Sequence, residues 1–212
     1  FVDGRPHKAD GAARYRTWYD DFPATGYTFS MPVVYPWNGI YAWYDYTVPD
    51  YRWFRAMLLE ASSAGKSASP GVPVITFVHW HTVPTPDNPK PDVPQMSPDA
   101  YRELLWHMLF RGTDTFFMWC GGAENPDEVR YVHEVYAAAQ KYGEFLDRGI
   151  PVSFEVPDRP GTVVSGLELK GRVLVRRTDF AVNASPVNIT VKGKRLSIPA
   201  MPGECRVFRL PK

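Results

Sequence analysis

The chain has 212 residues, of which 44% are hydrophobic, so it is long enough to bury one ordinary core or a medium core and a small one. Its Lys and Arg residues nearly balance its Asp and Glu residues, with a net charge of +1. This balance excludes the basic surface typical of proteins that bind nucleic acid or a membrane by charge, so we expect neither among its partners.

Residues 29–35 form the first predicted strand, because β-branched and aromatic residues dominate them. The proline inside this run is more usual at the edge of a sheet than in a central strand. A loop with several aromatic residues follows, and a helix is predicted over residues 48–64. Thr47 is the expected cap of that helix, and Gly65 is expected to end it.

A second unit of the same kind follows the first. Residues 72–79 form the best strand pattern in the chain, with the continuous apolar character of a strand that is covered on both faces. A proline-rich loop then leads to Ser97 and Pro98, which are typical of the start of a helix. Apolar residues recur at helical spacing until Gly112, where we expect the helix to end.

The third unit begins with a strand predicted over residues 113–119. After a short loop, Asn125 is the expected cap of a long helix that ends at Gly149. Three consecutive strand–loop–helix units indicate parallel strands joined by right-handed crossovers.

The composition changes after Gly149, where the helical spacing of apolar residues stops and short alternating runs begin. We therefore predict a domain boundary there, with residues 1–149 in one domain and residues 150–212 in a small antiparallel β-sandwich. Turn-forming pairs separate the expected strands, at Lys170-Gly171, Lys192-Gly193 and Pro202-Gly203.

Residues 1–149 have room for only three or four strand–helix units, whereas an eight-unit barrel takes about 250 residues. The units therefore belong either to the last part of a (β/α)8 TIM-type barrel or to an open α/β sheet. The chain starts at Phe1 without Met, which favours a fragment. We expect the N-terminal part of the barrel on a missing segment or on another chain.

In both arrangements ligands bind beyond the carboxyl ends of the strands, so the loops there are the expected site. Each of the three loops contains tryptophan, with histidines and carboxylates nearby. Pyranose rings present apolar C–H faces that stack on aromatic rings, and their hydroxyls need fixed hydrogen-bond partners. The alternative is that these aromatic residues only fill the end of a barrel. The predicted substrate-binding residues are Trp37, Trp43, His79, His81 and Trp119.

Two stretches resemble the C-terminal end of (β/α)-barrel glycoside hydrolases. LLWHMLFRGTDTFFMWC is similar to their final helix–Gly–strand unit, and VKGKRLSIPAMPGECRVFRL is similar to the β-domain often attached there. The resemblance covers roughly residues 97–212. It implies a TIM-type barrel followed by a β-sandwich, hydrolysis of an oligo- or polysaccharide without a cofactor, and Trp119 in the sugar site. An extracellular or periplasmic location is expected with it.

Glycoside hydrolases need two carboxyl groups that flank the scissile bond. In the common barrel pattern one of them follows the seventh strand, where this chain has His79-Trp80-His81 instead. Asp45 and Glu124 are the carboxylates in suitable loops, and they are the predicted catalytic pair. The alternatives are that further catalytic carboxylates lie upstream, or that the protein binds carbohydrate without cleaving it.

His79 and His81 are two residues apart at the end of a predicted strand, so both imidazoles can point to the same face. This spacing resembles the first metal motif of metal-dependent amidohydrolases, which makes a metal-dependent hydrolase a further alternative. No other predicted strand end supplies a third ligand, so we expect no metal.

Overall fold

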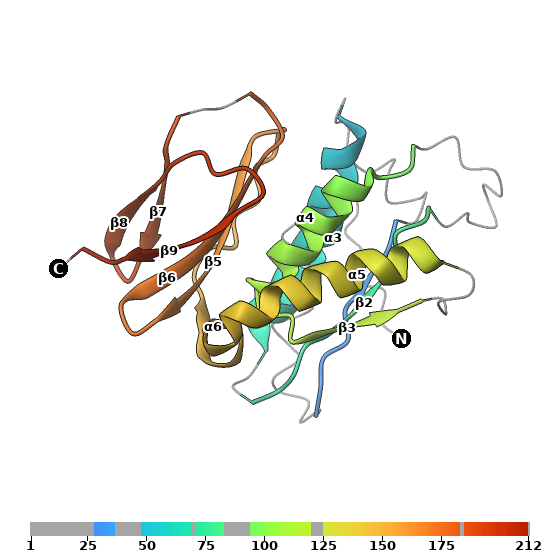
Figure 1. Cartoon of the computed structure of the whole chain (residues 1–212), viewed down its shortest axis with the longest axis horizontal. Helices are drawn as coiled ribbons and strands as arrows, with labels where there is room; N and C mark the ends of the chain where they lie inside the picture. Colours follow the sequence, from blue (N-terminus) through green and yellow to red (C-terminus); the bar gives the residue numbers. More distant parts are fainter. Residues whose placement is uncertain are drawn as a thin grey trace.

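The computed structural model describes residues 28–36, 48–68, 71–82, 94–119, 125–182 and 185–211. The first half contains three short strands that alternate with helices, as Figure 1 shows. In chain order these elements are β1 (Val33–Val34), α3 (Pro49–Ser67), β2 (Ile75–Val78), α4 (Pro98–Leu109), β3 (Thr115–Met118) and α5 (Pro126–Ala139).

The three strands form one parallel sheet in the order β1-β2-β3, which confirms the parallel pairing predicted from the repeated units. In this register Phe77 of β2 lies opposite both Val33 of β1 and Phe117 of β3. The strands are shorter than predicted. Pro32, inside the first run, has no N–H to donate to the ladder, and its carbonyl accepts a hydrogen bond from Phe77 N at 2.9 Å.

The prediction of a TIM-type barrel followed by a β-sandwich is wrong. In the part of the chain that the structure describes, the parallel sheet has three strands and stays open, so it does not close into a barrel. The open α/β sheet, which the sequence pattern also allowed, is the arrangement observed. Repeated strand–helix units determine the direction and handedness of the connections, but they do not determine closure, which depends on strand number and tilt.

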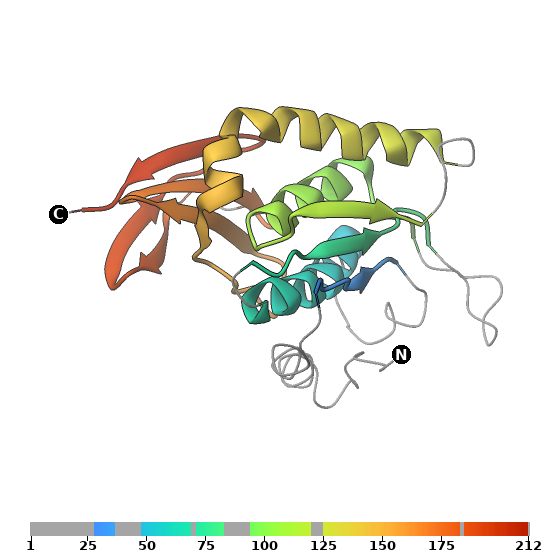
Figure 2. The same ribbon diagram turned by 90° about the horizontal axis from the view of Figure 1, so that it is seen from below.

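The main core lies between one face of the sheet and the helices α3, α4 and α5. Alternation along β2 points Thr76 and Val78 into this core, where both are buried. Figure 2 shows α3 and α4 behind the sheet and α5 alongside β3. The largest apolar side chains of this core come from α3 and α4, and include Trp53, Phe54, Met57, Tyr101, Leu104 and Leu105.

The helix boundaries differ from the prediction at two glycines. Helix α3 continues past Gly65 to Ser67, and the third helix stops at Ala139, ten residues before Gly149. A short 3-10 turn, η2 (Gln140–Tyr142), then redirects the chain into α6 (Gly143–Arg148), which turns away from α5 in Figure 2.

The three predicted helix caps have different outcomes. Val48 occupies the cap position of α3, and Thr47, the predicted cap, lies outside the described residues. The Ser97 side chain accepts a hydrogen bond from Ala100 N, which confirms it as the cap of α4. Asn125 occupies the cap position of α5, as predicted, but its side chain makes no capping hydrogen bond to that helix.

The second half of the chain is free of helix from residue 152 onward in the described part, as predicted. An antiparallel sheet in the order β4-β5-β6-β9 contains β4 (Ile150–Pro151), β5 (Thr162–Leu169), β6 (Arg172–Asp179) and β9 (Cys205–Arg209). A separate hairpin contains β7 (Val187–Val191) and β8 (Lys194–Ile198). We call residues 150–211 the β-module.

The predicted turns of the β-module are confirmed by their backbone conformation. Lys170 and Gly171 both have positive φ, at 51° and 76°, and Lys192 and Gly193 repeat this at 50° and 76°. Two successive residues with positive φ are typical of the tight turn whose twist suits a two-residue hairpin loop.

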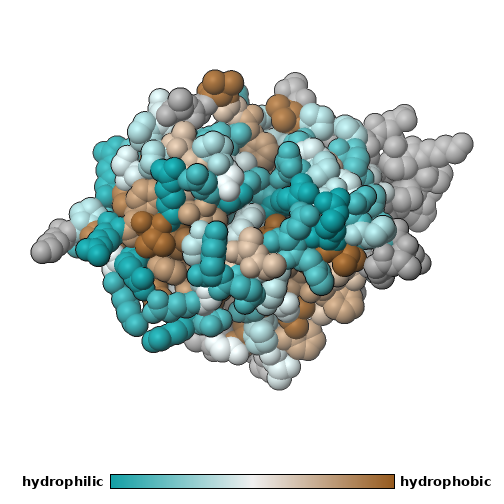
Figure 3. All heavy atoms as spheres, viewed as in Figure 1, coloured by the Kyte–Doolittle hydropathy of each residue, from teal (hydrophilic) through white to brown (hydrophobic). Residues whose placement is uncertain are grey.

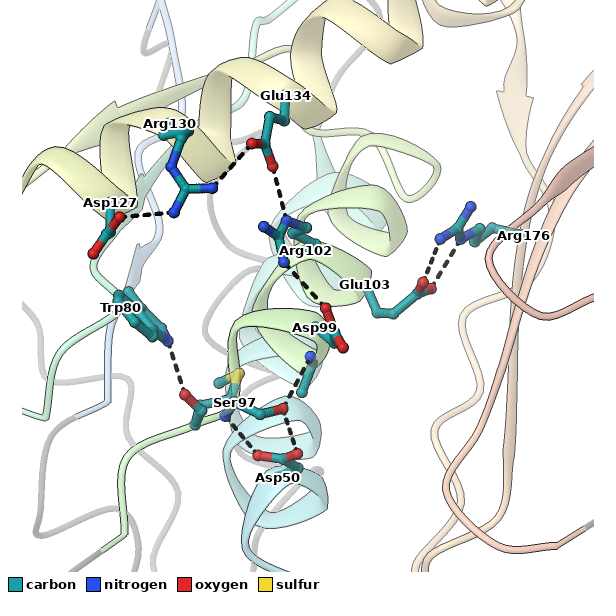
Figure 4. A network of polar contacts seen from close by, with 12 residues as sticks. Asp50, Trp80, Ser97, Asp99, Arg102, Glu103, Asp127, Arg130, Glu134 and Arg176 are labelled. Carbon is teal, nitrogen blue, oxygen red and sulfur yellow. Dashed lines mark hydrogen bonds and ion pairs between the residues drawn. The ribbon is translucent and has the colours of Figure 1, made fainter.

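The β-module packs against α4 and α6, at the end of the parallel sheet where the strands begin (Figures 1 and 2). Arg176 of β6 forms an ion pair with Glu103 of α4, which Figure 4 shows across the gap between the two ribbons. The carboxyl ends of the parallel strands lie at the opposite end. The division into two domains at residue 149 stays a prediction.

Hydrophilic side chains cover much of the face seen in Figure 3, with hydrophobic ones scattered between them. On α4 and α5 these include a chain of ion pairs in which Glu134 contacts both Arg102 and Arg130 (Figure 4). Such exposed pairs contribute little to stability individually. Among the described helices, none is long and apolar enough to cross a membrane.

Candidate functional site

Three of the predicted site residues meet at the carboxyl ends of the parallel strands. The His79 ring lies 5.7 Å from the His81 ring and 6.5 Å from the Trp119 ring, measured between centroids. The other two predicted substrate-binding residues, Trp37 and Trp43, lie outside the described residues, and so does the predicted catalytic pair, Asp45 and Glu124.

Four aromatic side chains form a continuous row on the face of the sheet that the described helices α3, α4 and α5 do not cover. We call Tyr35, Phe77, Phe117 and Trp119 the aromatic strip. The register of β2 and β3 stacks Phe77 on Phe117, with ring centroids 5.2 Å apart and an interplanar angle of 16°. Trp119 contacts both Phe77 and Tyr35 at 5.4 Å.

The strip follows directly from strand alternation. Phe117 and Trp119 are two residues apart, so both point away from the helices, and Trp119 N continues the pairing with a hydrogen bond to Val78 O at 3.1 Å. Phe117 and Trp119 are each 52% exposed. Large aromatic faces left in water beside fixed polar groups are typical of a binding surface.

His79 lies at the edge of the strip but is buried, with 6% of its surface exposed. Its Nδ1 atom is 2.9 Å from Oε2 of Glu128, which belongs to the first turn of α5. Because the strand end of β2 supplies the histidine and another element supplies the carboxylate, this contact depends on how α5 packs beside the sheet.

Glu128 is itself buried, with 1% of its surface exposed. Its second oxygen, Oε1, accepts a hydrogen bond of 2.8 Å from the hydroxyl of Tyr101 on α4. Burial raises the pKa of Tyr101 well above its usual value, and the negative charge and hydrogen bond of Glu128 raise it further. The Tyr101 hydroxyl therefore stays protonated and remains a donor.

Sequence reasoning did not identify Glu128 and Tyr101 as site residues. Glu128 was expected in the first turn of a helix, where acidic residues are common because they interact favourably with the helix dipole. Tyr101 was expected on the apolar face of α4. No sequence signal separates these roles from the one observed, because the contacts join residues up to 49 positions apart.

Trp80, between the two histidines, points into the protein and anchors the loop. Its indole Nε1 donates to Met96 O at 2.9 Å, as Figure 4 shows, and its ring packs against Tyr101 and Tyr131. Gln95 also binds this loop, donating to Trp80 O and accepting from Thr82 N. These contacts fix the backbone on both sides of His81.

The described residues contain no group of three His, Cys, Asp or Glu side chains placed to hold a metal ion. His79 Nδ1 is already occupied by Glu128. Nothing described therefore favours the metal-dependent hydrolase that the two histidines suggested.

Two hollows on the described surface lie away from His79 and Trp119. One, of about 280 Å³, lies between β3 and α5 and has an apolar lining that includes Phe116, Met118 and Val132. The other, of about 580 Å³, lies between α3, residues 152–156 and β7. Among the described residues, the candidate site consists of the aromatic rings beside Trp119 and the buried polar contact of His79.

Comparison of the chain with models of protein families, with curated proteins and with solved structures finds no match.

Proposed function

We propose that this chain binds an oligo- or polysaccharide along the aromatic strip and acts on it as a glycoside hydrolase. The observation that carries the proposal is the exposed indole of Trp119, in one row with Tyr35 and Phe117 and next to the buried imidazole of His79. This combination offers both an apolar platform and a fixed polar group.

Each part of a sugar has a counterpart on this surface. The C–H face of a pyranose ring stacks on an aromatic face, and the exposed rings of Trp119 and Phe117 lie on neighbouring positions of one strand face. The hydroxyls at the ring edge need hydrogen-bond partners, and the histidines at the end of β2 supply them. A row of several rings suits a chain of sugar units better than one unit.

The reaction proposed is hydrolysis by paired carboxyl groups, without a cofactor. Glu128 is excluded as a member of the pair, because both of its oxygens are engaged inside the protein. The proposed acid and base or nucleophile are Asp45 and Glu124. In a retaining enzyme their carboxyl groups stand about 5–5.5 Å apart, and in an inverting enzyme about 6.5–9.5 Å.

The experiment compares the native chain with Trp119→Ala in gels that contain β-glucan, xylan, mannan or pectin. The native chain is expected to be retarded by at least one polysaccharide. Loss of the stacking ring is expected to weaken that binding by about 1–3 kcal/mol, by analogy with the cost of removing one aromatic ring on which a nucleic-acid base stacks. The Tm should change little, because the ring is half exposed.

Tyr136→Ala is the matched control, because Tyr136 is an exposed aromatic residue of α5 outside the strip. It is expected to bind as the native chain does. Equal retardation of the native chain and Trp119→Ala, or no retardation by any polysaccharide, would contradict the proposal. Release of reducing ends that survives both Asp45→Asn and Glu124→Gln would exclude this pair, and binding without hydrolysis would favour a carbohydrate-binding protein.

A further inference from the structure

The buried contact between Glu128 and His79 is unusual because an ionised carboxylate is costly to remove from water. Glu128 is 1% exposed, and its two oxygens meet a hydroxyl from α4 and an imidazole from the end of β2. Its place in the first turn of α5 adds the favourable field of the helix N-terminus. Side chains from α4, α5 and the end of β2 thus meet at one carboxylate, which contacts the histidine of the candidate site.

The hydrogen positions in this group follow from the chemistry of its members. Tyr101 keeps its proton and donates it to Oε1 of Glu128. An ionised carboxylate has only acceptor oxygens, so the hydrogen atom between Oε2 and His79 belongs to Nδ1. When the imidazole is neutral, its other nitrogen, Nε2, then carries a lone pair and no hydrogen.

We propose that His79 is a hydrogen-bond acceptor for a ligand hydroxyl through Nε2, and that Glu128 is the positioning residue that holds it in this tautomer. In the described part of the chain, Nε2 has no hydrogen-bond partner. The identity of the ligand rests on the proposed function, whereas the tautomer is a property of the protein alone.

Such an acceptor determines specificity. A lone pair fixed at the edge of the strip favours a ligand that brings a donor to it, and a hydroxyl supplies one while a ring carbon or an ether oxygen does not. His79 is 6% exposed, so it is reached by a single small group rather than by a whole ring. It therefore selects which hydroxyl of a sugar stacked on Trp119 is accepted.

The tautomer is measured on the full chain without a ligand, from long-range ¹H–¹⁵N correlations of the histidine rings in a slightly basic buffer. The His79 signals are assigned with His79→Phe. The native chain is expected to show His79 with hydrogen on Nδ1 alone, and Tyr101→Phe should keep it, because the carboxylate remains. Glu128→Ala is expected to lose the single tautomer, whereas Glu134→Ala, an exposed acidic residue of the same helix, should keep it.

A native chain whose His79 carries its hydrogen on Nε2 would overturn the inference. This measurement needs no variant, so the inference can be tested even if Glu128→Ala does not fold. An unchanged His79 tautomer in a folded Glu128→Ala chain would overturn it as well.

The second readout is polysaccharide affinity in the same gels. His79→Phe is expected to weaken binding about 3- to 10-fold, as expected for one hydrogen bond. Glu128→Ala should weaken binding by no more than His79→Phe does. Because Glu128 acts through His79, the double variant should bind no more weakly than His79→Phe alone. A further loss in the double variant would overturn the positioning role. Failure of the native chain to bind polysaccharide would contradict the proposed function, whereas a wrong tautomer would contradict the role of His79.

Discussion

At the scale of single residues, the imidazole of His107 in α4 is held by hydrogen bonds at both of its ring nitrogens. It is fully buried, with Nδ1 2.7 Å from Ser165 Oγ and Nε2 3.0 Å from Thr178 Oγ1. The Thr178 hydroxyl donates to Glu103, so its oxygen accepts a hydrogen bond from Nε2. In the neutral ring the hydrogen is therefore on Nε2, and Nδ1 accepts from the Ser165 hydroxyl.

Burial lowers the pKa of His107 well below its usual value, and the positive charges of Arg111 and Arg176 lower it further. An unfolded chain binds a proton at this residue below about pH 6.5, while the folded chain does not. The stability that depends on neutral His107 is therefore present in full above pH 6.5. It is lost as the pH falls toward the pKa of His107 in the folded chain.

Denaturant unfolding between pH 6.5 and 5 is expected to show this loss, with a slope of up to about 1.4 kcal/mol per pH unit. His107→Gln should lower stability at pH 7 but remove most of the slope. Hydrogen bonds lower the pKa of carboxylates such as Glu168 from the usual value of 4.5. Their protonation therefore reduces stability only below that pH and does not contribute to the slope between pH 6.5 and 5. An equal slope in the native chain and the variant would contradict the prediction.

At the scale of elements, helix α3 and the turn after α4 approach each other through two glycines. A Cβ atom on Gly65 would stand 1.9 Å from the backbone oxygen of Arg111, and Gly112 faces it with φ at +100°. Gly65 is thus required by close packing of two backbones, which explains why it does not end its helix.

Gly65→Ala is expected to lower the free energy of unfolding by about 1–3 kcal/mol or more, the cost of overpacking a close contact, even though alanine favours helix. Gly143→Ala is the matched control, because Gly143 begins α6 and has nothing within 4 Å of an added Cβ. It should leave the Tm unchanged or slightly raise it. A Gly65→Ala chain as stable as the control would show that α3 can move away without cost.

At the scale of the whole molecule, Arg111 joins the αβ half of the chain to the β-module. Its side chain is fully buried and donates to Ser62 of α3, to Ser165 of β5, and to the carbonyls of Phe154 and Glu155. Burial lowers its pKa to about 9, so it remains charged at neutral pH. One guanidinium therefore satisfies backbone groups that would otherwise be buried without partners.

Arg111→Met keeps most of the side-chain volume but removes these donors. We expect a loss of at least about 3 kcal/mol in the free energy of unfolding, because several buried acceptors are left unpaired. Arg130→Ala, which removes an arginine from the exposed ion pairs of α5, should leave the unfolding midpoint nearly unchanged. Similar midpoints for the two variants would contradict a joining role for Arg111.

The local pattern of the sequence predicted the units of this fold but not their assembly. The Ser97 cap and the turns at Lys170-Gly171 and Lys192-Gly193 act over a few neighbouring residues and are confirmed. The strand predicted over residues 72–79 is confirmed only for Ile75–Val78, whose burial alternates, so the covering expected on both faces is not observed among the described residues. Gly65 shows the limit, because α3 continues past it, whereas Gly149 occupies the C-cap position of α6. A glycine looks the same in a sequence whether it ends a helix or permits a close contact.

By itself the sequence determined the parallel strand–helix units, the antiparallel module after them, and the placing of His79, His81 and Trp119 at one end of the sheet. These follow from periodicity, because alternation and crossover direction are local properties. Only the tertiary structure decided that the sheet stays open and that Glu128 and Tyr101 turn one histidine into an oriented group. Those features depend on the packing of separate helices, which no short stretch of sequence encodes.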